Sequence, residues 1–153
     1  MGICLPCLQP MTKSHSDNRR SGLESTVEAQ LIGLGYQPEY EAERIKFRVP
    51  SIRTYIPDYR MLDVNGQHFY IEVKGLWTPA DRAKFLNVLA TNPSLRIFVA
   101  LQRPNQRLSR TTIQTYGDWA SKHGVCWCPV PIPDWFLAKW TQGETCSFSN
   151  TRP

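Results

Sequence analysis

The stretch from Tyr55 to Lys74 reads YIPDYRMLDVNGQHFYIEVK and carries the clearest structural pattern in the chain. From Phe69 onward, apolar and polar residues alternate, which is the period of a β-strand with one buried face. Asn65-Gly66, ahead of this strand, is a strong signal for a tight turn. The stretch therefore predicts a β-hairpin near the middle of the chain.

The length of the hairpin loop decides which acidic side chains can meet. A two-residue loop would turn the Asp58 carboxylate to the wrong face of the sheet, because side chains alternate between the two faces. A three-residue loop, Val64 to Gly66, places Asp58 opposite Glu72, on the same face as Lys74. We predict the three-residue loop, with Gly66 in the left-handed conformation of a bulged turn.

Helix and strand patterns alternate on both sides of the hairpin. Apolar residues recur at helical spacing after Ser21, and the continuous apolar run 96–101 is typical of a strand buried on both faces. These patterns predict an α/β fold with a mixed central sheet flanked by helices, in which 96–101 forms the middle of the sheet. The expected elements are a helix over 21–35, strands over 45–49, 55–61 and 69–74, a helix over 78–92, a strand over 96–101, a helix over 116–123, a strand over 125–128, and a short helix that opens at Pro133 and bears Trp140.

The chain has 153 residues, which suits one domain with a hydrophobic core. We expect this domain to span 20–140. Residues 1–19 and 141–153 show no periodicity, and we predict that both are disordered tails.

Lysine and arginine together number 18 and aspartate and glutamate 13, which gives a net charge of +5. A basic balance of this kind is typical of proteins that bind a polyanion such as DNA. The chain contains no apolar run of bilayer length and no signal-peptide pattern, and Pro6 breaks the myristoylation motif that Met1-Gly2 begins. We expect a soluble, cytoplasmic protein without membrane contact.

The five cysteines leave two interpretations open. Cys4 and Cys7 form a CxxC pair, but the remaining cysteines are far away, with the wrong spacing for the second half of a zinc site. In a reducing compartment they would all remain thiols, with Cys126 and Cys128 as ordinary strand residues. The spacing favours thiols over zinc, and no pattern indicates an organic cofactor.

Asp58, Glu72 and Lys74 form the one constellation with evident chemistry. Two carboxylates can hold Mg²⁺ or Mn²⁺ against a phosphate, and a lysine beside them can stabilise developing negative charge. This grouping predicts metal-dependent phosphodiester hydrolysis. The alternative is that a Pro-Asp turn and an exposed Glu-x-Lys are merely solvated edges of a sheet.

The pair of segments Pro57-Asp58 and Glu72-Val73-Lys74 resembles the catalytic signature of the restriction-endonuclease-like nucleases. A longer set of matching blocks, spanning roughly residues 20 to 136, resembles the phage endonuclease I family of Holliday-junction-resolving enzymes. The blocks are Arg20 to Glu24, Glu39 to Glu41, Tyr55 to Tyr59, Glu72 to Trp77, Tyr116-Gly117, Lys122 to Gly124 and Ile132 to Trp135. The lysine-rich C-terminal tail of that family is not matched here.

The resemblance implies a restriction-endonuclease-like fold and assigns roles residue by residue. Asp58 and Glu72 would be metal ligands, Lys74 would lie beside the attacked phosphate, Glu24 would be a further catalytic carboxylate, and Glu39 an additional candidate acid. It also implies a homodimer that exchanges its N-terminal part, bridged near 45–55, and acts on branched DNA. Helix capping by itself would explain Glu24 equally well.

Basic residues outside the constellation are candidates for DNA contacts, although simple solvation would also explain them. Two rival functions stay open beside the junction-resolving enzyme. One is a sequence-specific nuclease of the restriction or transposition type, and the other is a catalytically inactive DNA-binding module. The candidate DNA-contacting residues are Arg20, Arg82, Lys84, Arg103, Arg107 and Arg110.

Overall fold

The computed structural model describes residues 21–146 of the chain. Arg20, the predicted tail 1–19 with its Cys4-Cys7 pair, and residues 147–153 lie outside this range. Among the described residues, no helix is both long and apolar enough to cross a membrane. The elements are α1 Gly22–Gly33, β1 Glu39–Tyr40, β2 Ile45–Val49, β3 Ser51–Tyr55, β4 Tyr59–Leu62, β5 His68–Lys74, α2 Pro79–Thr91, β6 Ile97–Leu101, α3 Tyr116–Lys122, β7 Trp127–Pro129 and α4 Asp134–Thr141.

Five strands form the central sheet in the order β1-β4-β5-β6-β7. The pairs β1–β4 and β4–β5 are antiparallel, whereas β5–β6 and β6–β7 are parallel. Parallel neighbours need a crossover, and here α2 and α3 provide it. The predicted α/β fold with a mixed sheet is therefore confirmed.

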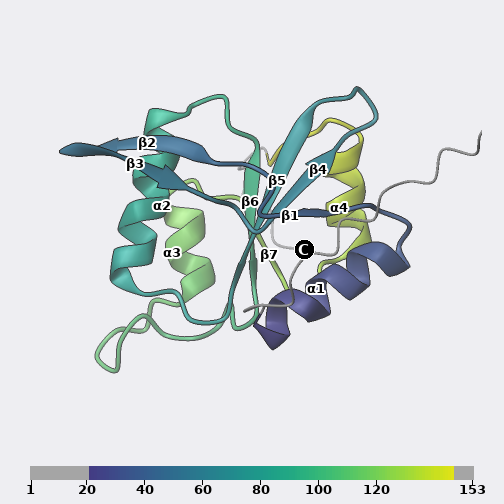
Figure 1. Ribbon diagram of the computed structural model, residues 1–153. Helices are drawn as coiled ribbons and strands as arrows, with labels where there is room; N and C mark the ends of the chain where they lie inside the picture. Colours follow the sequence, from purple (N-terminus) through teal and green to yellow (C-terminus); the bar gives the residue numbers. More distant parts are fainter. Residues whose placement is uncertain (1–20, 147–153) are drawn as a thin grey trace, which may run out of the picture.

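Helices cover both faces of the sheet (Figure 1). On one face, α1 and α4 pack against apolar side chains of β4, β5 and β6, including Phe69 and Phe98. On the other face, α2 and α3 pack against alternate side chains of β6 together with the inner residues of β2 and β3. Every residue of β6 is buried, as the apolar run predicted, although β5 rather than β6 is the middle strand.

The predicted hairpin register is confirmed. Tyr59 pairs with Ile71, so the next position of the ladder sets Asp58 opposite Glu72. The Asp63 amide donates to the Gln67 carbonyl at 2.9 Å and closes a loop of three residues. Gly66 has φ +74°, the left-handed conformation that glycine adopts without steric cost.

The prediction of one strand over 55–61 is wrong, because the chain breaks at Ile56-Pro57-Asp58. Proline has no amide hydrogen to donate to a ladder, and Pro57 is buried at the junction between two strands. β3 ends before it and pairs only with β2, forming a two-stranded arm separate from the main sheet. β4 begins after it and joins the main sheet.

Order continues beyond Trp140, the end of the domain expected from the sequence. Thr141 is the last residue of α4 and is buried, and Cys146 packs against the core on the α1–α4 face. Cys126, Cys128 and Cys146 are free thiols in the described part of the chain. Cys128 is buried in β7, as expected of an ordinary strand residue.

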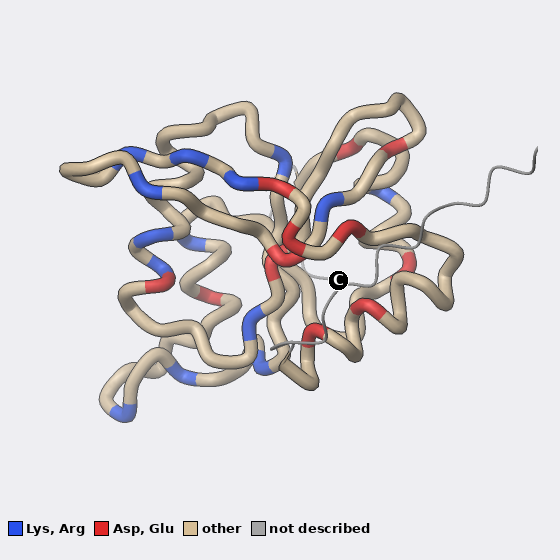
Figure 2. The backbone as a smooth tube through the Cα atoms, viewed as in Figure 1, with Lys and Arg blue, Asp and Glu red and all other residues tan. Residues whose placement is uncertain are grey.

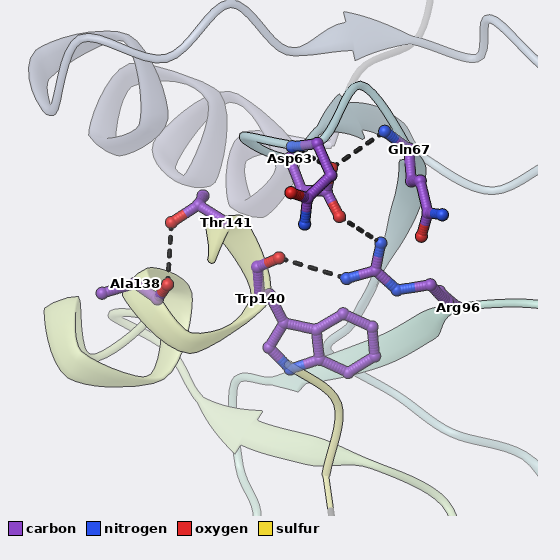
Figure 3. Close-up of polar contacts among 7 residues, drawn as sticks. Asp63, Gln67, Arg96, Ala138, Trp140 and Thr141 are labelled. Carbon is purple, nitrogen blue, oxygen red and sulfur yellow. Dashed lines mark hydrogen bonds and ion pairs between the residues drawn. The ribbon is translucent and has the colours of Figure 1, made fainter. Parts of the chain in front are cut away.

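A buried ion pair ties the hairpin loop to α4 (Figure 3). Arg96 donates to the Asp63 carboxylate at 2.6 Å and to the Trp140 carbonyl at 3.2 Å. The same carboxylate accepts the amides of Asn65 and Gln67 at 2.9 and 2.8 Å. Asp63 thereby organises the loop whose length sets the hairpin register.

Asp63→Asn should lower the melting temperature by at least several degrees at pH 7, because Arg96 loses its buried counterion. Burial opposes ionisation of Asp63, but the hydrogen bonds from Gln67, Arg96 and Asn65 hold its pKa below the ordinary value. The ionised Asp63 carboxylate contributes its full stabilisation of the fold at pH values above the ordinary aspartate pKa, about 3.9. This stabilisation is lost as the pH falls through the lower pKa that Asp63 has in the folded protein. Thermal unfolding from pH 7 to pH 2.5 should therefore show the two proteins converging at the acid end.

The exposed Glu144→Gln provides the matched control and should leave the melting temperature unchanged at both ends of the range. A constant difference between Asp63→Asn and the parent protein down to pH 2.5 would contradict the ion-pair explanation.

Candidate active site

Asp58 and Glu72 lie side by side on the sheet face that packs against α2 and α3. Glu72 is in β5 and only 4% exposed, whereas Asp58 is half-buried in the break between β3 and β4. The Asp58 carboxylate accepts the backbone amide of Val73 at 2.7 Å. That bond fixes the direction of the carboxylate and holds it against the neighbouring strand.

Lys74 occupies the same face two residues beyond Glu72. Its Nζ lies 2.7 Å from Glu72 Oε1 in an ion pair with little access to solvent. Burial alone would lower the pKa of Lys74, but the charges of Glu72 and Asp58 raise it. The lysine is therefore held as a cation beside the two acids.

The other carboxylate oxygen of Glu72, Oε2, is buried and has no hydrogen-bond partner within residues 21–146, and neither has the hydroxyl of Tyr55. Burial, the charge of Glu72 and the closeness of the Tyr55 hydroxyl to the Glu72 carboxylate raise the pKa of Tyr55 well above its ordinary value, although the two groups do not meet the geometry of a hydrogen bond. A buried oxygen without a partner is costly unless something else satisfies it. Tyr55 was given no role from the sequence, since a tyrosine at a strand end carries no distinguishing signal.

Asp58 is the most perturbed acid of this group. Burial and the charge of Glu72 raise its pKa to about 8, with a smaller contribution from Glu24, while the Val73 hydrogen bond and Lys74 act in the opposite direction. Two carboxylates that crowd one site cannot easily both be ionised. The pair is thus short of positive charge even with Lys74 present.

Glu24 lies close enough to Asp58 to influence its ionisation within a single subunit. Its carboxylate accepts the hydroxyl of Tyr40 at 2.8 Å, and its backbone carbonyl accepts the hydroxyl of Tyr59 at 2.6 Å. A Cβ atom on Gly75 would meet the Gln102 side chain at 3.1 Å and Leu23 at 3.4 Å, an ordinary van der Waals distance, so the start of α1 packs directly against the end of β5. Ser21 caps α1 by accepting the amide of Glu24, and the carboxylate of Glu24 turns to β1.

Glu39 is engaged away from the pair of acids, because it forms an ion pair with Arg60 across the β1–β4 ladder. Glu41, two residues on, donates its amide to the Asp58 carbonyl at 2.8 Å and has φ +46°. Left-handed backbone is uncommon for a residue with a side chain and is retained where surrounding contacts enforce it. The contact holds the Asp58 segment against the end of β1.

The basic candidates fall into different environments. Arg82 was a candidate for DNA contacts, but it is only 8% exposed, donates to the Trp77 carbonyl and lies over the rings of Tyr116 and Trp119. Packing between α2 and α3 therefore explains much of its role. Lys84 lies 5.5 Å from the centre of the Tyr55 ring, near the acids. Arg103, Arg107 and Arg110 are exposed on the loop between β6 and α3.

Figure 2 shows how charge is distributed around this site. Acidic residues gather where β1, β4 and β5 meet, and basic residues spread along the β2–β3 arm and the loop between β6 and α3. An acidic centre flanked by basic surfaces suits a substrate whose backbone is negatively charged and whose reacting group is bound through a cation.

The donor set offered by Asp58 and Glu72 consists of carboxylate oxygens, which Mg²⁺ and Mn²⁺ prefer. Within residues 21–146, no three histidine, cysteine, aspartate or glutamate side chains come together as a ready-made metal cluster. Magnesium does not require one, because it commonly binds through one or two carboxylates and keeps several waters. The Glu72 oxygen that has no partner among these residues and the raised pKa of Asp58 both fit a cation between the two acids.

The fold and this site place the chain among α/β proteins that present two carboxylates and a lysine from adjoining strands of a mixed sheet. The sequence model described as Phage endonuclease I matches residues 9–149. Endodeoxyribonuclease 1 of Enterobacteria phage T3 is 36% identical over 115 residues, which cover 74% of this chain and 73% of that protein. Endonuclease I of Escherichia phage T7 is 34% identical over 122 residues, which cover 79% and 76%. The chain belongs to the phage endonuclease I family.

Glu72→Gln should lower the pKa of Asp58 from about 8 towards the ordinary aspartate value, because it removes the nearest like charge. The pKa should stay above that value, since burial, the largest cause, remains. Carboxyl ¹³C shifts followed by NMR titration of metal-free protein would measure it. Glu39→Gln is the control and should leave the Asp58 titration in place, because Glu39 is paired with Arg60. An Asp58 midpoint unaffected by Glu72→Gln would show that the two acids do not interact.

Proposed function

We propose that this protein is a metal-dependent DNA endonuclease that cuts four-way junctions and other branched DNA. The observation that carries the proposal is the placement of Asp58, Glu72 and Lys74 on one sheet face, with one Glu72 oxygen buried and without a partner among the described residues. Membership of the phage endonuclease I family supports the reaction class. The names of the T3 and T7 relatives, an endodeoxyribonuclease and an endonuclease, support DNA as the substrate.

Asp58 and Glu72 would hold Mg²⁺ or Mn²⁺ through their carboxylate oxygens. Such a cation supplies a Lewis acid for the phosphate and an activated water near neutral pH. The Val73 amide orients Asp58, so the carboxylate is in place before the cation binds. Lys74 offsets only part of the repulsion between these two carboxylates, so binding of a divalent cation would be electrostatically favourable.

Lys74 would stabilise the negative charge that develops on the attacked phosphate. Its ammonium group is held as a cation by the ion pair with Glu72, and a fixed charge in a partly buried site needs no rearrangement during the reaction. Glu24 would act as a further carboxylate of the site. Tyr40 and Tyr59 hold it near Asp58 through its carboxylate and its backbone carbonyl.

A homodimer with exchanged N-terminal parts would suit a branched substrate. A four-way junction presents paired scissile phosphates, and a two-fold axis supplies paired sites. Exchange of residues 21–44 would move α1 and β1 together to the partner subunit, so the hydrogen bond between the Tyr40 hydroxyl and the Glu24 carboxylate would stay within one chain. The hydrogen bond from the Tyr59 hydroxyl to the Glu24 carbonyl would then join the two subunits. The β2–β3 arm is a suitable bridge, because it forms no part of the central sheet and Ser51 to Thr54 are exposed.

Recognition of branch shape rather than base sequence follows from contacts made mainly to phosphates, which carry no direct sequence information. The exposed Arg103, Arg107 and Arg110 are suited to such contacts.

We also propose that the protein acts in the cytoplasm, which is that of the host cell if a phage encodes it, because its proposed substrate is intracellular DNA.

Asp58→Ala should reduce Mg²⁺-dependent cleavage of a labelled four-way junction by more than about 100-fold, because substitutions that only touch the surroundings of a metal ligand already cost about 10- to 100-fold. Binding of the junction should be retained. Glu39→Gln, which alters an acid outside the site, should cleave at close to the parent rate. Unchanged cleavage by pure Asp58→Ala protein would refute the assigned site, and equal cutting of junction and matched linear duplex would refute the branched substrate.

A mixed dimer tests whether Glu24 acts across subunits. Glu24→Ala and Asp58→Ala chains should each be inactive alone. With N-terminal exchange, a dimer of one chain of each kind contains one intact site, because the intact Glu24 of one chain meets the intact Asp58 of the other. Co-expressed chains with different affinity tags should therefore nick one strand of the junction. Failure of the purified mixed dimer to nick would show that each subunit uses its own Glu24.

A further inference from the structure

A cavity of about 620 Å³ opens beside the end of β5, between the segment that follows Lys74 and the loop that joins β6 to α3. This volume falls within the range of about 300–1,000 Å³ typical of small-ligand pockets. Its inner wall includes the buried residues Trp77, Arg82 and Tyr116, and its rim includes the exposed residues Leu76, Arg107 and Arg110. We refer to it as the 76–110 pocket.

The 76–110 pocket combines positive charge with an apolar wall. Neither Arg107 nor Arg110 forms an ion pair with an acidic residue of the described chain, and both are exposed at the rim. Leu76 is 67% exposed, although a leucine gains free energy when it is removed from water. The guanidinium groups can bind a phosphate, and the apolar surface beside them can pack against a flat ring. A ligand that carries both groups, such as a nucleotide, suits this pocket.

The loop on one side of the pocket has a defined shape. The Leu108 amide donates to the Gln114 carbonyl at 2.9 Å, and the Tyr116 amide donates to the Gln106 carbonyl at 2.9 Å. The Tyr116 hydroxyl in turn accepts the Trp77 amide at 3.3 Å, which joins the loop base to the segment after β5. The arginines are therefore presented from an anchored hairpin.

The pocket lies within reach of the scissile phosphate of the proposed nuclease reaction. Leu76 is two residues from Lys74, a chain distance of at most about 7 Å. The loop starts directly alongside, because Gln102 donates its amide to the Lys74 carbonyl at 2.9 Å. Phosphates along one DNA strand follow one another roughly every 3.4 Å of helix axis. A strand whose phosphate is held at Lys74 would thus pass the pocket within one to a few nucleotides.

We propose that the 76–110 pocket binds one unstacked nucleotide of the DNA strand next to the scissile phosphate. The phosphate of that nucleotide is held by Arg107 and Arg110, and its base packs against Leu76 and the neighbouring apolar wall. Because bases at a branch point are more readily unstacked than bases within a duplex, the pocket adds preference for branched over linear DNA. The inference rests on the proposed nuclease function and names a site for one part of its substrate.

The test uses the full-length protein and a four-way junction. Cleavage by the parent protein in Mg²⁺ first maps the scissile phosphates and tests the nuclease function on its own. Binding is then measured in EDTA over a range of salt concentrations, which does not depend on cleavage. Arg107→Ala/Arg110→Ala is compared with Lys122→Ala/Lys139→Ala, a control that removes the same charge from exposed positions outside the pocket lining.

The arginine variant should bind more weakly and reduce the slope of log affinity against log salt by about 0.7 to 0.9 for each phosphate that the protein no longer binds. A single abasic nucleotide is then moved through the positions on each side of the branch point, which are known whether or not the junction is cut. At one position it should weaken binding by the parent protein roughly 5- to 150-fold, the range expected when one packed base is removed. At that position, the abasic nucleotide should weaken binding by Leu76→Ala protein by a much smaller factor.

An arginine variant that matches its lysine control in salt slope would overturn the proposal. The proposal would also be overturned if, at every position, the abasic nucleotide weakened binding by the same factor in Leu76→Ala protein as in the parent protein. Leu76 is exposed, so its replacement should leave the melting temperature unchanged and the comparison remains interpretable. Failure of junction cleavage with both binding results intact would instead count against the nuclease function alone.

Discussion

The three-residue loop Val64 to Gly66 sets the register of β4 against β5, and the whole site depends on that register. A shift by one residue would move every side chain of one strand to the opposite face, so Asp58 would point towards α1 and α4 while Glu72 pointed towards α2 and α3. Gly66 in the left-handed region and the bonds from the loop amides to Asp63 maintain the register. Arg96 extends this restraint to α4, far along the sequence.

The same register brings two carboxylates together in a poorly solvated place, which opposes folding in the absence of a cation. The ion pair to Lys74 and the amide of Val73 offset part of the cost, yet one oxygen of Glu72 and the hydroxyl of Tyr55 stay without partners among residues 21–146. Local instability of this kind is common at sites shaped for a ligand rather than for stability. The surrounding core is correspondingly dense, with Trp77, Phe85 and Phe98 fully buried.

The two pairs of helices cover opposite faces of the sheet and position different parts of the site. α1 and α4 close one face and bring Glu24 towards the acids, and Leu23 of α1 packs beside Gly75, directly after β5. α2 and α3 close the other face and leave the β2–β3 arm and the loop between β6 and α3 to carry basic residues outward (Figure 2). In the proposed function, the sheet between these layers would hold the reacting groups, and the protruding segments would contact the substrate.

Local sequence alone determined the hairpin, its odd register, most of the other helices and strands, and the face shared by Asp58, Glu72 and Lys74. These features follow from side-chain alternation, helix caps and turn residues within a few positions of one another. Only the tertiary structure decided that Pro57 separates two strands, that Glu39 pairs with Arg60, that Arg82 is buried and that Tyr55 joins the acids. Each of these depends on which distant segment packs nearby, and burial and charge pairing between distant segments leave no periodic trace in the sequence.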